Sequence, residues 1–135
     1  MTYEGQTAAA AEEMARAEEE LRAADHLMRA PMPRIALTRA SFACFHAARS
    51  LLYLENLEPR SHEGVWHLFN LHFVRPRRFP TTTSKLIARL QKFREEADYA
   101  ASFVIDEAGA REEIEAARGF VELVAAERAR HTSPS

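Results

Sequence analysis

Residues 39–52 read Arg39-Ala-Ser-Phe-Ala-Cys-Phe-His-Ala-Ala-Arg-Ser-Leu-Leu52, and this stretch decides the fold. Its apolar side chains recur at helical spacing and cover more than half of the circumference of an α-helix. A helix this apolar is expected at the centre of a bundle, with other helices packed around it. The arginines that flank its apolar surface then need internal ion pairs or an anionic ligand, because a guanidinium that loses its water without a partner is costly.

Two prolines and a serine mark the limits of the first three helices. Pro31 and Pro33 end the first helix, because proline lacks an amide hydrogen and clashes with the preceding turn. The central helix then runs from about residue 34 to residue 56. Ser61 is placed to cap a short third helix over about residues 62–74.

Two more long helices follow a basic loop that contains proline. The fourth helix starts from a cap at Thr83 or Ser84, and the fifth follows a break near residues 102–106. No segment alternates as a strand does, so we predict an all-α, up-and-down bundle of four long helices plus one short helix. The seams of the first, fourth and fifth helices are Met14, Ala17, Leu21, Ala24 and Met28; Leu86, Leu90, Phe93, Ala97 and Ala101; and Ala110, Ile114, Ala117, Val121 and Val124.

Length and cysteine content bound the class of protein. The 135 residues suffice for one domain, which we expect over residues 1–135, with its core at about residues 10–128 and frayed ends. The single Cys44 lies in an apolar run and is expected to be a small packed side chain, as in reduced cytoplasmic proteins. Residues 1–20 lack a secretory leader pattern, and no stretch approaches the roughly 20 apolar residues that span a bilayer. We therefore expect a cytoplasmic protein that does not enter membranes.

Charge is segregated along the chain although the net charge is only −2. The middle segment, residues 60–94, is strongly basic, while residues 95–127 are strongly acidic. Either helices of opposite sign neutralise one another across the bundle, or the basic segment forms an electropositive groove for phosphates. The basic residues of the middle segment, against Glu63 alone, are Arg60, Arg75, Arg77, Arg78, Lys85, Arg89, Lys92 and Arg94.

The central helix carries a second stripe, distinct from its most apolar face. Phe42, His46, Arg49 and Tyr53 follow one another at i, i+4, i+7 and i+11. Two covered faces on one helix need two partners, of which the protein's own core is one. The other is the fifth helix or a second subunit, and we take this stripe as the candidate face of a homodimer.

Arg94 lies at the edge of the fourth helix's seam, and Asp98 follows it by one turn. The two form either an intrahelical ion pair or a phosphate site in which Asp98 fixes the rotamer of Arg94 and Tyr99 donates its hydroxyl. If the second and fourth helices are neighbours, His46 and Arg49 border the same cleft.

Three histidines invite a metal hypothesis, but their spacing argues against it. His62, His67 and His72 are five residues apart, which points them to different sides of a helix, whereas paired ligands on one helix sit at i, i+4. We predict no metal site and no cofactor. His62 is better explained as a residue of the first helical turn whose ring bonds a neighbouring group.

Four segments in this order resemble the HEPN superfamily, in particular its small single-domain proteins from bacteria and archaea. The resemblance covers about residues 10–128. It implies a bundle of four or five helices, a homodimer with a cleft lined by the second and fourth helices, and a minimal nucleotidyltransferase partner in a toxin-antitoxin-like module. The segments are residues 39–52, Ser61-His-Glu-Gly-Val65, Phe69-x-x-x-Phe73-Val and Arg94-x-x-x-Asp98-Tyr99.

Family members with ribonuclease activity carry an arginine followed four to six residues later by histidine. After Arg94 these positions hold Asp98, Tyr99 and Ala100, so the histidine is absent. The residues and the resemblance together predict a non-catalytic homodimer that binds a nucleotide or RNA, or docks a nucleotidyltransferase, through a cleft containing Arg94. Two alternatives stay open: a metal-independent ribonuclease in which His46 or His62 replaces the missing group, and a structural interaction module whose basic residues pair with its acidic helices.

Overall fold

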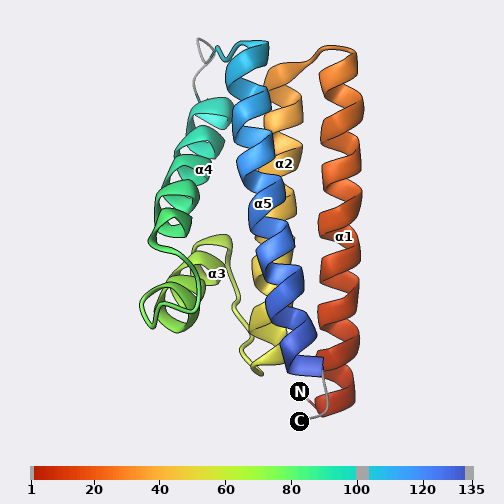
Figure 1. Cartoon of the computed structure of the whole chain (residues 1–135), viewed down its shortest axis with the longest axis vertical. Coiled ribbons are helices and arrows are strands. Elements are labelled where there is room, and N and C mark those ends of the chain that lie inside the picture. Colours follow the sequence, from red (N-terminus) through yellow and green to blue (C-terminus); the bar gives the residue numbers. More distant parts are fainter. Residues whose placement is uncertain (1, 100–103, 133–135) are drawn as a thin grey trace.

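Figure 1 shows the computed structural model, which describes residues 2–99 and 104–132, with side chains described for residues 2–96 and 104–131. Every element in these ranges is helical, so the all-α bundle predicted from the sequence is confirmed. None of the described helices is both long enough and apolar enough to cross a membrane. The elements are α1 (Tyr3–Arg29), α2 (Pro33–Leu54), α3 (His62–Phe69), the π-helical turn η1 (Asn70–Val74), α4 (Thr81–Tyr99) and α5 (Glu107–Thr132).

The second helix lies at the centre of the bundle, as its apolar surface predicts. It packs against α1 and α5 along its length and also touches α3 and α4. In Figure 1, α5 crosses in front of α2, α1 stands beside them on the right, and α4 stands at the left edge of the bundle. The α1–α2 contact is built from alanine, which lets two backbones approach closely. The fully buried alanines of these two helices are Ala10, Ala17 and Ala24 on α1 and Ala36, Ala40, Ala43, Ala47 and Ala48 on α2.

Aromatic residues fill the space where α3, η1 and the following loop meet α5. Phe69 is fully buried, and its ring lies 4.9 Å from Phe73, 5.1 Å from Phe79 and 5.4 Å from Phe120, measured between ring centroids. Offset and edge-on aromatic pairs at these separations add stability beyond the burial of their area. This cluster therefore anchors the loop between η1 and α4 to the core.

Local signals placed the start of α3 correctly and the start of α4 incorrectly. Ser61 caps α3 as predicted, since its hydroxyl accepts a hydrogen bond from the Gly64 amide at 2.9 Å. The fourth helix starts at Thr81, not at a cap from Thr83 or Ser84. Because Phe79 is anchored in the core, the chain turns into the helix directly after Pro80, and Thr83 is buried inside the first turn.

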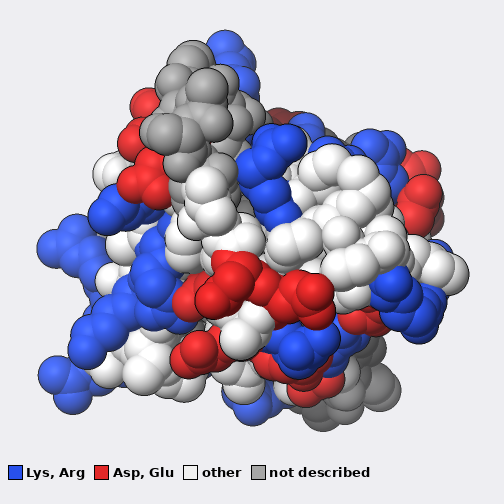
Figure 2. Space-filling model, turned by 90° about the horizontal axis from the view of Figure 1, so that it is seen from above, with Lys and Arg blue, Asp and Glu red and all other residues white. Residues whose placement is uncertain are grey.

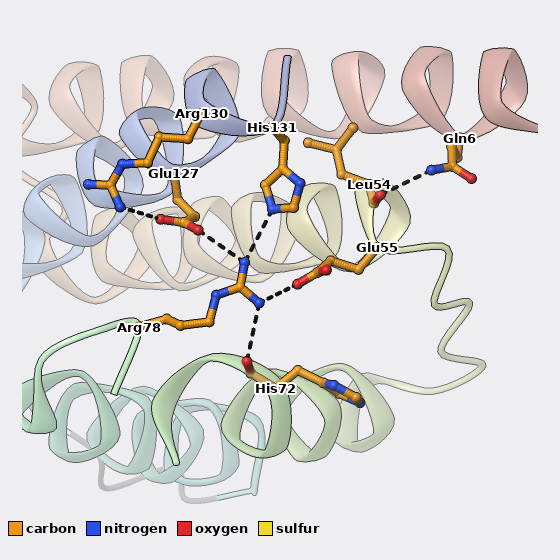
Figure 3. Close-up of polar contacts among 8 residues, drawn as sticks. All are labelled: Gln6, Leu54, Glu55, His72, Arg78, Glu127, Arg130 and His131. Carbon is orange, nitrogen blue, oxygen red and sulfur yellow. Dashed lines mark hydrogen bonds and ion pairs between the residues drawn. The ribbon is translucent and has the colours of Figure 1, made fainter. Parts of the chain in front are cut away.

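Arg78 ties three elements together (Figure 3). Its guanidinium donates to Glu55 beyond the end of α2, to Glu127 of α5 at 3.0 Å and to the carbonyl oxygen of His72 at 3.5 Å. The guanidinium also lies 4.3 Å from the centroid of the Phe73 ring. One arginine of the basic segment is therefore used to hold the bundle together.

Cys44 is a packed side chain of the core, as expected. It is fully buried, its Sγ lies 3.7 Å from the carbonyl oxygen of Ala117, and burial raises the pKa of its thiol. A thiol held protonated in this way is a poor nucleophile.

Candidate functional site

The polar residues of α2 gather around one carboxylate of α1. The Nδ1 of His46 lies 2.7 Å from Oε2 of Glu13, and a guanidinium nitrogen of Arg49 lies 3.7 Å from Oε1 of the same residue. The Nε of Arg49 donates to the Tyr53 hydroxyl at 2.7 Å. Glu13 is therefore an anionic partner, within the same chain, for His46 and Arg49 of the predicted stripe. The Tyr53 hydroxyl orients Arg49.

His62 lies beside this group at the start of α3. Its ring stacks on that of Phe45, with centroids 4.3 Å apart and planes 1° from parallel, while the His46 ring meets the same phenylalanine edge-on at 5.3 Å. Burial first, and then the electrostatic influence of Arg94 and His46, lower the pKa of His62 from 6.5 to about 4. At neutral pH, His62 is consequently an uncharged hydrogen-bonding group within the electrostatic influence of the Arg94 guanidinium.

Arg94 is thus within electrostatic reach of His62, as the cleft hypothesis requires. Its side chain is exposed, and no carboxylate within 4.0 Å of it is found among residues 2–96 and 104–131. The side chains of Asp98 and Tyr99 lie outside the described residues, so their predicted roles beside Arg94 remain predictions.

A pocket of about 420 Å³ opens between α2 and the segment that leads into α3. Arg49 and Arg60 supply positive charge to it, and His62 supplies a neutral ring. No carboxylate belongs to its lining, which is completed by apolar walls. This combination suits a ligand with an anionic group and a flat, partly apolar ring. The lining residues are Phe45, Arg49, Pro59, Arg60, Ser61, His62 and Val65.

Phe42, the first residue of the stripe, is half-buried, and the guanidinium of Arg39 lies 4.9 Å from its ring centroid. Within the chain, α1 and α5 both pack on α2, so the second face of this helix has partners of its own. A contact with a second subunit through Phe42, His46, Arg49 and Tyr53 remains a prediction.

The basic segment divides into paired and unpaired residues. Besides Arg78, Arg89 pairs with Glu113 at 3.1 Å and Lys92 with Glu96 at 3.9 Å, so neutralisation between elements accounts for part of the charge. Figure 2 shows lysine and arginine side chains gathered on the left, the side on which α4 lies in Figure 1. Those without a carboxylate partner in the described part of the chain are Arg60, Arg75, Arg77, Lys85 and Arg94.

Sequence reasoning missed Glu13, and it named Arg60 only as part of the basic segment without assigning it to the cleft. Glu13 directly precedes Met14 of the α1 seam, which places it at the border of the buried face. This position indicates that the carboxylate lies beside a neighbouring helix. Which side chains it meets depends on how α1 is rotated against α2. Arg60 directly precedes the Ser61 cap, and only the path of the loop brings it to the pocket.

Comparison with known proteins agrees with the fold. The HEPN domain family matches residues 10–128. A protein of Methanocaldococcus jannaschii named "Putative toxin MJ0605" is 39% identical over 83 residues, which are 62% of this chain and 62% of that protein. A protein of Pyrococcus horikoshii named "UPF0332 protein PH1297" is 46% identical over 57 residues, which are 42% of this chain and 40% of that protein. The chain thus matches less than two thirds of the length of either relative.

Proposed function

Because this chain belongs to the HEPN family, we propose that it is the toxin-like member of a two-component module and binds a nucleotide or RNA through the pocket beside Arg94. The name of the M. jannaschii relative supports a toxin-antitoxin setting. The observation that carries the binding proposal is the pocket itself, in which Arg49 and Arg60 lie next to a neutral His62, with Arg94 in electrostatic reach.

The chemistry of these groups favours a phosphate and a base together. Guanidinium groups bind phosphate oxygens through paired N–H donors, and their charge is not lost at any physiological pH. The neutral ring of His62 either donates or accepts a hydrogen bond, and the apolar walls exclude water from a bound ring. A nucleoside monophosphate or one residue of a single-stranded RNA carries both features.

Calorimetric titration with AMP, ATP and short single-stranded RNAs tests the proposal. We expect Arg60→Ala and Arg94→Ala each to weaken binding by about tenfold, which is the loss of one charge-assisted contact. Arg22→Ala is the matched control, because Arg22 is an exposed arginine on α1 outside the pocket lining. Binding that is absent, or equal in all variants, contradicts the proposal. Unchanged ligand signals with a changed unfolding midpoint for Arg94→Ala would instead favour the structural interaction module.

A two-component module needs a partner protein, and we propose that this partner is a minimal nucleotidyltransferase. We also propose that this chain forms a homodimer. The stripe Phe42, His46, Arg49 and Tyr53 is the proposed homodimer face. Co-expression with a nucleotidyltransferase encoded next to it, followed by co-purification on a tag carried by only one chain, tests the partnership. Separate elution of the two proteins contradicts it.

A second candidate is a metal-independent ribonuclease with a rearranged acid-base group. Glu13 holds Nδ1 of His46, and a carboxylate behind an imidazole is the arrangement that orients a catalytic base. Incubation with RNA in excess EDTA tests this activity. Cleavage that His46→Ala abolishes and Arg22→Ala does not affect supports the candidate, and intact RNA after prolonged incubation eliminates it.

A further inference from the structure

The pocket between α2 and the start of α3 collects three nitrogen-bearing side chains. Arg49 comes from α2, whereas Arg60 and His62 come from the segment that leads into α3, and all three line the same cavity of about 420 Å³. No carboxylate belongs to this lining. A small anion in the pocket can therefore be bound from two sides at once.

Arg49 is held in a fixed position but keeps its outer nitrogens for a ligand. Its Nε donates to the Tyr53 hydroxyl at 2.7 Å, and its guanidinium carbon lies 5.9 Å from the centroid of the Phe45 ring. Glu13 lies 3.7 Å from one terminal nitrogen, which is close enough for an ion pair but too far for a hydrogen bond. Within the described part of the chain neither terminal nitrogen makes a hydrogen bond, so both can donate to an anion.

The His62 ring is fixed in a similar way. It stacks on the Phe45 ring, with centroids 4.3 Å apart and planes 1° from parallel. Neither ring nitrogen makes a hydrogen bond to residues 2–96 or 104–131, although the side chain is half-buried. A polar group that is partly removed from water and has no partner costs stability, and a ligand oxygen at this position would recover that cost.

Two positive charges at or near the pocket are not neutralised within the described part of the chain. Arg60 is exposed and has no carboxylate within 4.0 Å of it there. Arg94, which acts electrostatically on His62 from α4, has none either. Arg49, by contrast, shares its charge with Glu13.

Nucleotides and RNA contain two kinds of phosphate, which differ in charge and in the number of free oxygens. A terminal phosphate has three free oxygens and a charge of about −1.5 to −2 at neutral pH. A phosphate that links two nucleosides has two free oxygens and a single charge. Three converging side chains and two uncompensated positive charges match the terminal group better.

From this arrangement we infer that the pocket binds a terminal phosphate, at the end of a nucleotide or of an RNA strand, in preference to a phosphate inside a strand. This ligand class rests on the proposed function and narrows it. Arg49 and Arg60 each donate to a phosphate oxygen, and His62 donates to the third. Because the bound dianion favours the charged imidazole, His62 takes up a proton on binding.

Calorimetric titration with AMP and with its methyl ester tests the preference, because the ester keeps the nucleoside but has a phosphate with a single charge. We expect AMP to bind about tenfold more tightly at pH 7.5. Arg60→Ala and His62→Asn should each reduce this preference, and Arg22→Ala should retain it. Equal binding of both ligands by the wild type overturns the inference while the proposed function stands. Binding of neither ligand, nor of any RNA, contradicts the proposed function itself.

Two RNA tetranucleotides of one sequence, with and without a 5′-phosphate, identify the source of the terminal phosphate. Tighter binding of the phosphorylated strand assigns the pocket to an RNA end. If AMP displaces both strands equally well, the pocket is assigned to a free nucleotide. A strand without the phosphate that binds more tightly than AMP overturns the preference for a terminal group.

The pH dependence of sulfate binding tests the role of His62, because sulfate keeps two negative charges throughout the range used. If the bound anion returns the pKa of His62 from about 4 to its ordinary value of 6.5, sulfate should bind about tenfold more tightly at pH 5.5 than at pH 8. The other charged or titratable groups around this ring in the described part of the chain are His46, Arg49, Arg60 and Arg94, with Glu13 behind His46.

Variants separate His62 from these neighbours. His62→Asn should remove most of the pH dependence of sulfate binding, whereas His67→Asn, at an exposed position of the same helix, should retain it. Sulfate binding by the wild type that does not change between pH 8 and pH 5.5 overturns the proton uptake. A pH dependence that His62→Asn leaves unchanged overturns its assignment to His62.

Discussion

Protonation of His62 should destabilise the folded protein in mildly acidic solution. Its pKa falls from 6.5 in the unfolded chain to about 4 in the folded protein, mainly because the ring is buried beside Phe45 and additionally because of the electrostatic influence of Arg94 and His46. Between these two pKa values the unfolded chain binds more protons than the folded one. Stability therefore decreases as the pH falls from about 6.5 to about 4 and is fully retained above this range.

The size of the effect follows from the same two values. With these pKa values, the free energy of unfolding at pH 5 is about 2 kcal/mol lower than at neutral pH. His62 is only half-buried, so water screens part of the interaction, and we expect about 1 kcal/mol. The assay is urea-induced unfolding at pH 7.5 and pH 5, followed by circular dichroism, for the wild type and for His62→Asn.

The comparison between variants isolates His62 from other titrating groups. His62→Asn should lose about 1 kcal/mol less than the wild type between the two pH values. His67→Asn on the same helix is the control, because His67 is exposed, and it should follow the wild type. If the wild type and His62→Asn show the same loss of stability, the assigned environment of His62 is wrong.

Three further predictions concern stability, each measured by the free energy of unfolding in urea at pH 7.5. Phe69→Ala should cost about 3–5 kcal/mol, because it empties the centre of the aromatic cluster; a cost below about 1 kcal/mol would contradict the packing. Arg78→Met should cost about 2–3 kcal/mol, because the buried Glu127 then loses its ion pair with Arg78; an unchanged midpoint would show that this ion pair contributes nothing. Ser61→Ala should cost about 1 kcal/mol through loss of the α3 cap, whereas Ser61→Asp should retain it.

Local sequence patterns were sufficient to predict which segments form helices. The three-then-four spacing of Met14, Ala17 and Leu21 and the cap at Ser61 depend on residues within one or two turns, so they can be identified without the fold. The start of α4 could not be identified in this way. It depends on Phe79, which a distant aromatic cluster holds in the core.

For the candidate site, the sequence by itself determined that His46 and Arg49 lie on the second helix and that His62 lies at the start of the third. It also determined that Arg94 follows later, on a basic helix. Only the tertiary structure decided that Glu13 holds His46, that Phe45 stacks on His62, and that Arg60 lines the pocket with Arg49. The reason is geometric. Periodicity says which face of a helix is buried, but the rotation and crossing of packed helices decide which side chains from distant segments meet.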